Sequence, residues 1–176
     1  MRKLLNNELN RLSIEEFKKA EKIPLIIVLD NIRSQHNIGA VFRTSDAFLI
    51  EKVYLCGITA TPPNAEIHKS ALGAESTVEW KYFQHTIEAM AELTMSGYTV
   101  ISIEQADGAI ELSNFEVDKS KKYAVVFGNE VKGVLQEVVS KSNYCVEIAQ
   151  YGTKHSLNIS ITAGIVIWEL FKKMKQ

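Results

Sequence analysis

The chain has 176 residues, a length that suits about one domain. Hydrophobic residues make up 46% and charged residues 23%, which is typical of a folded globular protein and excludes a disordered chain. The formal net charge of -1 excludes a protein that holds nucleic acid by bulk charge, because such affinity comes from Lys and Arg that neutralise phosphates. Any contact with nucleic acid must therefore rest on local basic patches.

No export or membrane segment is predicted. The first 22 residues mix charged residues with scattered Leu, Ile and Phe and lack the uninterrupted apolar stretch of a signal peptide. The longest apolar-rich stretch, 159–171, is shorter than the ~20 residues that span a bilayer. Cys56 and Cys145 lie far apart in apolar, strand-like runs, which is typical of reduced thiols. We therefore expect a cytoplasmic protein.

The opening segment to about residue 22 is predicted to be helical, because Leu5, Leu9 and Leu12 recur at helical spacing and Ser13 with Glu16 fits a capping box. Pro24 ends it. Strands are then predicted at 24–30, 52–56, 78–83, 98–103, 123–128 and 144–149. Helices are predicted at 38–48, in a short form within 66–77, at 86–95 with Thr86 as cap and Gly97 as stop, at 134–140 and at 157–175.

This alternation predicts an α/β fold: a single domain with a mainly parallel sheet and helices on both faces. We assign residues 24–176 to the domain and 1–23 to an N-terminal helical extension. Because ligands bind at the carboxyl ends of parallel strands, the loops after Leu29, Val126 and Ile148 are the candidate site.

The first of these loops leads into the helix at 38–48. Asn37 can cap that helix, Gly39 permits close approach of another backbone, and Arg43 follows about a turn and a half later. An ordinary capped helix with a surface arginine explains these residues equally well.

The second loop follows a strand that ends in glycine. Gly128 and Gly133 leave backbone groups open to a ligand, with Glu130 between them, although most loop glutamates are simply solvated. The phosphate-binding Gly-Lys-Ser/Thr and G-x-G-x-x-G patterns are absent from this loop, which weakens triphosphate and nicotinamide hypotheses.

The third loop leads into the last helix, which Ser156 or Asn158 can cap. Ser160, Ala163 and Gly164 are small enough for a tight helix crossing, and beside large apolar residues they also suit a homodimer seam.

Together and in this order, the three segments resemble the SpoU/TrmH family of RNA ribose methyltransferases in the SPOUT superfamily. The resemblance spans Pro24 to Trp168. The first family motif, N-x-G-x-x-x-R, is matched by Asn37, Gly39 and Arg43. The second, G-x-E-x-x-G, and the third, S-L-N-x-S, are matched by Gly128, Glu130 and Gly133, and by Ser156, Leu157, Asn158 and Ser160.

The resemblance implies a C-terminal trefoil knot, a homodimer, and an RNA substrate, with tRNA ahead of rRNA. It implies S-adenosylmethionine bound by residues of motifs two and three, which are Phe127, Gly128, Asn129, Gly133, Ile148, Gln150 and Leu157. The catalytic set implied by the resemblance is Arg43, Glu130, Asn158, Asn37 and Ser156.

The implied reaction is attack of a ribose 2′-oxygen on a sulfonium methyl. The family gives Arg43 the activating role, yet a guanidinium, with pKa above ~12, is essentially never deprotonated. We therefore expect Arg43 to orient the hydroxyl and the adjacent phosphate, while Glu130 and Asn158 position Arg43 and the ribose.

Two alternatives remain open. A non-catalytic RNA-binding or scaffolding member would keep the same fold, and a generic α/β enzyme could bind a nucleotide or flavin. The four histidines, His36, His68, His85 and His155, have no metal-ligand spacing, so no metal is expected.

Overall fold

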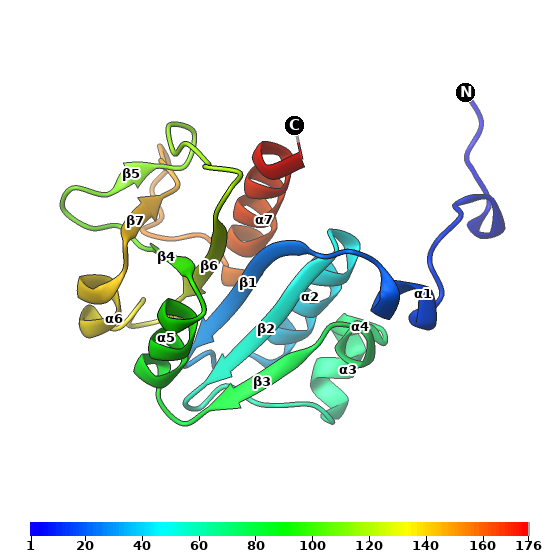
Figure 1. The fold of residues 1–176 in the computed structure, drawn as a ribbon, viewed down its shortest axis with the longest axis horizontal. Helices are drawn as coiled ribbons and strands as arrows, with labels where there is room; N and C mark the ends of the chain where they lie inside the picture. The colour runs from blue at the N-terminus through cyan, green and yellow to red at the C-terminus, as the bar shows by residue number, and fades with distance from the viewer. Residues whose placement is uncertain (176) are drawn as a thin grey trace.

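One parallel sheet of seven strands organises the molecule, in the order β3-β2-β1-β6-β4-β7-β5 (Figure 1). The computed structural model describes residues 1–175, with Asn6 described by its backbone alone; Gln176, the last residue of the predicted domain, lies outside the described residues. The strands are β1 (Ile23–Asp30), β2 (Ile50–Cys56), β3 (Trp80–Phe83), β4 (Tyr98–Ile103), β5 (Ile110–Glu111), β6 (Lys122–Phe127) and β7 (Tyr144–Glu147). The six pairings between neighbouring strands are parallel, which confirms the predicted sheet; only the two-residue β5 was missed.

Helices cover both faces of this sheet, as predicted. They are α1 (Ile14–Lys19), α2 (Gln35–Ala47), α3 (Ala65–Ala71), α4 (Ala74–Thr77), α5 (Thr86–Met95), α6 (Gln136–Lys141) and α7 (Ile159–Lys175). Buried residues of α2, α3 and α7 share one apolar cluster with the sheet, and those of α5 and α6 share another on the opposite face (Figure 1). In the part of the chain that the structure describes, no helix is both long and apolar enough to cross a membrane.

Strand β1 shows why the central strands read as continuous apolar runs. Leu25, Ile27 and Leu29 belong to the cluster under α2 and α7. Ile26 and Val28, which alternate with them, belong to the cluster under α5 and α6. Because successive side chains point to opposite faces and both faces are covered, all five positions from 25 to 29 are apolar.

The predicted N-terminal helix is wrong over its first half. Before α1 the chain forms only a 3-10 turn, Asn6–Glu8, and Leu5, Leu9 and Leu12 are 63%, 38% and 50% exposed. A short amphipathic segment with no surface to pack against lacks the main source of helix stability. The capping box is confirmed: Glu16 N donates to Ser13 Oγ over 3.2 Å, and Ser13 N donates to the Glu16 carboxylate over 2.8 Å.

Two predicted helix caps shift by one to three residues. Helix α2 begins earlier than predicted, and its cap is Ser34, whose Oγ accepts from Asn37 N over 3.2 Å. Helix α5 has the predicted bounds, but His85 is its cap, and the Thr86 hydroxyl donates to buried Asp30 over 2.5 Å instead. Both Asn37 and Thr86 are therefore inside their helices, where their side chains serve tertiary contacts.

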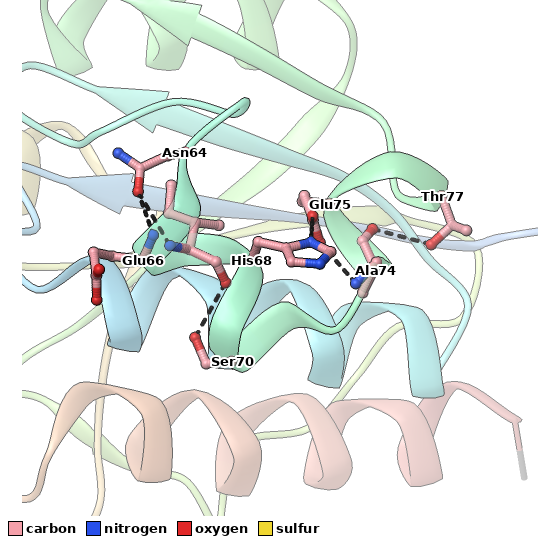
Figure 2. A network of polar contacts seen from close by, with 9 residues as sticks. Asn64, Glu66, His68, Ser70, Ala74, Glu75 and Thr77 are labelled. Carbon is pink, nitrogen blue, oxygen red and sulfur yellow. Dashed lines mark hydrogen bonds and ion pairs between the residues drawn. The ribbon is translucent and has the colours of Figure 1, made fainter.

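Helices α3 and α4 pack beside α2, and Figure 2 shows the side-chain contacts that cap α3 and join it to α4. Asn64 caps α3 by accepting from Glu66 N over 2.9 Å, and His68 Nδ1 lies 2.5 Å from Glu75. Helix α3 approaches α2 at Gly39, where any Cβ would collide with the Ile67 carbonyl. The predicted close approach at Gly39 is confirmed, and it fixes the helix that begins at the candidate site.

Candidate active site

A cavity of about 510 Å³ opens at the carboxyl ends of β4, β6 and β7. Its wall includes all seven residues predicted to hold a cofactor, which are Phe127, Gly128, Asn129, Gly133, Ile148, Gln150 and Leu157. Glu130, Ser156 and Asn158 of the predicted catalytic set also line it, whereas Asn37 and Arg43 do not. The loops that follow β6 and β7 thus meet in space, as the strand-end rule predicts.

The loop after β6 is folded tightly on itself. Asn129 and Gly133 exchange two backbone hydrogen bonds of 3.0 and 2.8 Å, and the Asn129 side chain accepts from Val131 N and Lys132 N. Asn129 Nδ2 also donates to the Asn31 carbonyl over 2.7 Å, which ties the loop to the end of β1. A Cβ on Gly128 would collide with the backbone of Gly133, so this turn requires glycine at 128.

Glu130 is anchored at the start of α2. Its carboxylate accepts from Arg33 N at 3.1 Å, from Ser34 N at 3.0 Å and from Asn37 Nδ2 at 3.3 Å. Partial burial alone would raise the pKa of this carboxyl, but these donors lower it below its ordinary value of 4.5. Glu130 is therefore a carboxylate at neutral pH.

Asn37 joins all three segments. Besides its bond to Glu130, its Oδ1 accepts from Asn158 Nδ2 over 3.2 Å, and the side chain is 9% exposed. Asn158 in turn accepts from Ser160 N over 2.8 Å and so caps α7, as predicted. Helices α2 and α7 therefore begin side by side at one polar junction, made by Glu130, Asn37 and Asn158.

Arg43 lies apart from this junction. Six residues beyond Asn37, it is about 9 Å further along the helix axis and on a different side of α2. The residue is exposed, and its side chain makes no hydrogen bond or ion pair with the residues that the structure describes. The structure thus brings Glu130, Asn37 and Asn158 together, and places Ser156 on the cavity wall, without Arg43.

The loop after β4 was missed in the sequence. Ile103, Glu104 and Gln105 line the cavity, and Gln105 Nε2 donates to the His155 carbonyl of the third segment over 2.9 Å. The sequence contains a signal for this part of the site: a polar Glu-Gln pair directly follows the apolar strand YTVISI, at the strand end where ligands bind.

Asp30 is a second missed residue, buried at the end of β1. Its carboxylate accepts from the Thr86 hydroxyl and, over 3.1 Å, from Leu135 N, where the loop after β6 (128–133, the glycine-rich loop) leads into α6. Asp30 therefore holds the C-terminal end of that loop against the end of β1.

The cavity suits the cofactor that the sequence resemblance implies. Its volume is in the range of sites for small ligands, roughly 300–1,000 Å³. Phe127, Ile148 and Leu157 supply apolar surface for an adenine ring. Three carboxylates line the wall against one lysine, a balance that favours a cationic sulfonium; they belong to Glu104, Glu130 and Glu147. Among residues 1–175, no group of His, Cys, Asp or Glu is arranged to hold a metal.

Solved structures share this fold. A TrmH/SpoU tRNA modifying enzyme from Aquifex aeolicus superposes with a TM-score of 0.80 at 22% identity, over 92% of this chain and 82% of that one. An AdoMet-bound rRNA methyltransferase from Sinorhizobium meliloti gives a TM-score of 0.79 at 24% identity, over 89% of this chain and 59% of that one.

Sequence relatives point the same way. A tRNA (guanosine(18)-2′-O)-methyltransferase from Aquifex aeolicus is 27% identical over 98% of this chain and 80% of its own length. A Staphylococcus aureus protein assigned to the TrmH family of tRNA/rRNA methyltransferases is 28% identical over 91% of this chain. The chain spans only 63% of the length of that relative.

The family model described as SpoU rRNA Methylase matches residues 24–168. This range holds the whole sheet except the first residue of β1, as well as the three segments that build the cavity and its polar junction. The chain therefore belongs to the SpoU rRNA Methylase family.

Proposed function

We propose that this protein transfers a methyl group from S-adenosylmethionine to a ribose 2′-hydroxyl of structured RNA, with tRNA the first candidate and rRNA the second. The observation that carries the proposal is the junction of Glu130, Asn37 and Asn158 at the mouth of an acidic, partly apolar cavity. The relative from Aquifex aeolicus is named for 2′-O methylation of a tRNA guanosine, which supports this substrate class. We place the protein in the cytoplasm, where such RNA is found.

S-adenosylmethionine, when bound, supplies an electrophilic methyl group on a sulfonium. The residues that would hold its adenosine half are Phe127, Ile148 and Leu157, by apolar contact, with backbone groups of Gly128, Asn129, Gly133 and Gln150 around them. We propose that the chain passes through a trefoil knot at this point, as the family resemblance implies.

Glu130 and Asn158, which line the cavity, are assigned the positioning of the substrate, and Asn37 holds both of them in place. The Asn37 Nδ2 donates to Glu130 and its Oδ1 accepts from Asn158, so the three side chains hold one another in a single arrangement. A prearranged polar junction lowers the cost of orienting an incoming hydroxyl. We assign Ser156, which lies on the cavity wall, a further polar contact with the ribose.

Arg43 would orient the 2′-hydroxyl and the neighbouring phosphate, while that phosphate takes up the hydroxyl proton. Because Arg43 projects away from its own junction, we propose that it serves the cavity of a second copy. The outer side of α7 supports a homodimer: Ile161, Ile165 and Trp168 recur at helical spacing and are 56%, 39% and 48% exposed.

Replacing Arg43 with Lys tests the proposal. We expect R43K to bind S-adenosylhomocysteine within about twofold of the wild type and to lose at least ~10²-fold in methyl transfer, because an ammonium cannot copy a planar, bidentate fork. Calorimetric titration and transfer of labelled methyl to tRNA and rRNA measure the two effects. The matched control is Arg11→Lys, an exposed arginine outside the domain, which should behave as wild type.

Near-normal transfer by R43K would refute the role of Arg43. Wild-type protein that binds S-adenosylhomocysteine yet methylates no RNA would favour the non-catalytic, scaffolding alternative. Protein that binds a mononucleotide or flavin instead would favour the generic α/β enzyme.

A further inference from the structure

The loop after β4 forms the wall between the two motif-bearing loops of the cavity. Strand β4 pairs with β6 on one side and β7 on the other, with Ile103 level with Phe127 and Val146. Glu104 and Gln105 therefore emerge between the glycine-rich loop and the loop that leads to α7. Both residues line the cavity.

The Glu104 carboxylate is fixed from two directions. One oxygen accepts from Val134 N over 2.8 Å, and the other accepts from Gln105 N over 2.9 Å. Gly133 lies against the same carboxylate with φ +69°, and a Cβ there would collide with it. An ionised carboxylate offers about four acceptor positions, so two remain after these bonds.

Two other carboxylates line the cavity, but neither is both held and available. Glu130 accepts three hydrogen bonds from the start of α2. The Glu147 side chain accepts no hydrogen bond from the residues that the structure describes, so nothing holds its carboxylate in place. Glu104 alone of these three combines a fixed position with spare acceptors.

We propose that Glu104 binds the two ribose hydroxyls of the adenosine half of the methyl donor. This inference rests on the proposed function. A vicinal diol presents two O–H donors, and a carboxylate at a strand end is the acceptor that nucleotide-binding α/β folds use for ribose. Glu104 follows Ile103 in the wall of the same cavity, whose apolar residues Phe127, Ile148 and Leu157 suit the adenine, whereas the polar junction at Glu130 marks the reacting end. The ribose joins these two parts of the donor.

The test measures discrimination between ligands. S-adenosylhomocysteine and its 2′-deoxy and 3′-deoxy analogues are titrated calorimetrically into the wild type and into Glu104→Gln. The glutamine keeps one oxygen for Val134 N but loses the negative charge. We expect the wild type to bind each deoxy analogue about 10- to 100-fold more weakly than the parent, the range for a hydrogen bond to a charged group. In E104Q this ratio should fall below about threefold.

Glu147→Gln is the matched control, since it removes the charge of a carboxylate that lines the same wall but is held by no hydrogen bond from the described residues, and it should keep the wild-type ratio. Wild type that binds the deoxy analogues as tightly as the parent would overturn the inference, whatever the variants do. An E104Q that weakens the binding of all three ligands by the same factor would also overturn it, because Glu104 would then only support the loop at Val134. A loss of discrimination in E147Q, with discrimination kept in E104Q, would overturn it as well. Absence of any S-adenosylhomocysteine binding to wild type would instead mean that the proposed function itself is wrong.

Discussion

At the scale of single residues, the polar junction depends on side chains that satisfy several partners at once. Asn37 uses both ends of its amide, and Glu130 receives two backbone N–H groups as well as that amide. Because Glu130 lies at the first turn of α2, its charge also faces the positive end of the helix. This carboxylate therefore contributes more to the junction than an ordinary loop glutamate.

Glu130→Gln should lower stability in a pH-dependent way. The folded-state pKa of Glu130 is depressed, so its contribution is fully present above the ordinary value of 4.5 and is lost as pH falls through the lowered value. We expect E130Q to unfold more easily than wild type by about 1 kcal/mol at pH 7, after allowance for solvent screening. The difference should shrink below pH 4.5. Denaturant unfolding of both proteins between pH 3 and 7 measures this, and a gap that stays constant would contradict it.

At the scale of elements, the close packing of α2 on α3 determines where α2 begins, and with it Asn37. Asn64 caps α3, and Ser70 Oγ donates to the His36 carbonyl in the first turn of α2 over 3.0 Å. Gly39 allows this approach, since its Cα faces the Ile67 carbonyl. The N-terminal end of α2, which donates hydrogen bonds to Glu130, is thus held in place by α3, on the side away from the cavity.

Gly39→Ala should destabilise the fold by about 1–3 kcal/mol, the usual cost of overpacking, because the added methyl meets backbone atoms that cannot turn away. It should also weaken binding of S-adenosylhomocysteine by displacing Asn37. Urea unfolding and calorimetry measure the two effects.

The control for this prediction is Gly152→Ala, where an added Cβ meets nothing within 4 Å and stability should change by less than about 0.5 kcal/mol. An equal effect of the two substitutions would show that glycine flexibility, rather than helix contact, determines the stability of G39A.

At the scale of the whole molecule, our proposal is that two chains together form the active site. The outer row of α7 is apolar and exposed, and Arg43 projects from α2, which packs beside α7. Helices α2 and α7 start together at the Asn37–Asn158 bond and are again in contact at the C-terminal end of α2, where the rings of Phe48 and Trp168 are 5.5 Å apart. A two-fold contact over α7 would therefore also bring α2 of one chain to its partner.

Mixing two inactive variants tests this arrangement. R43K lacks the arginine, and Asn158→Ala lacks the junction and the α7 cap. If Arg43 acts on the partner's cavity, each mixed dimer holds one intact site, so a co-refolded equal mixture should recover about a quarter of wild-type transfer.

Each variant refolded alone is the control and should stay inactive. No recovery from mixtures shown by tagged co-purification to contain mixed dimers would place Arg43 and its cavity in one chain.

The sequence alone was enough to predict the parallel sheet, the bounds of α5 and most of the cavity wall. These features depend on local patterns: apolar runs such as 24–30, and glycines at strand ends such as Gly128. The missed features depend on partners distant in the chain. Leu5, Leu9 and Leu12 have helical spacing but no surface to pack against. Ser34 rather than Asn37 caps α2, because the Asn37 side chain is bound to Glu130 and Asn158.

Only the tertiary structure decided that Glu104 and Gln105 stand between the two motif loops, because strand order is not encoded by spacing along the chain. The position of Arg43 also depends on the tertiary structure. The first motif predicts Arg43 beside Glu130, but Arg43 lies on a different side of α2 from Asn37, which is the residue that contacts Glu130. Local chemistry determines which element forms and which residues can react. Which of those residues meet depends on how buried faces pack, and packing is set by the whole chain at once.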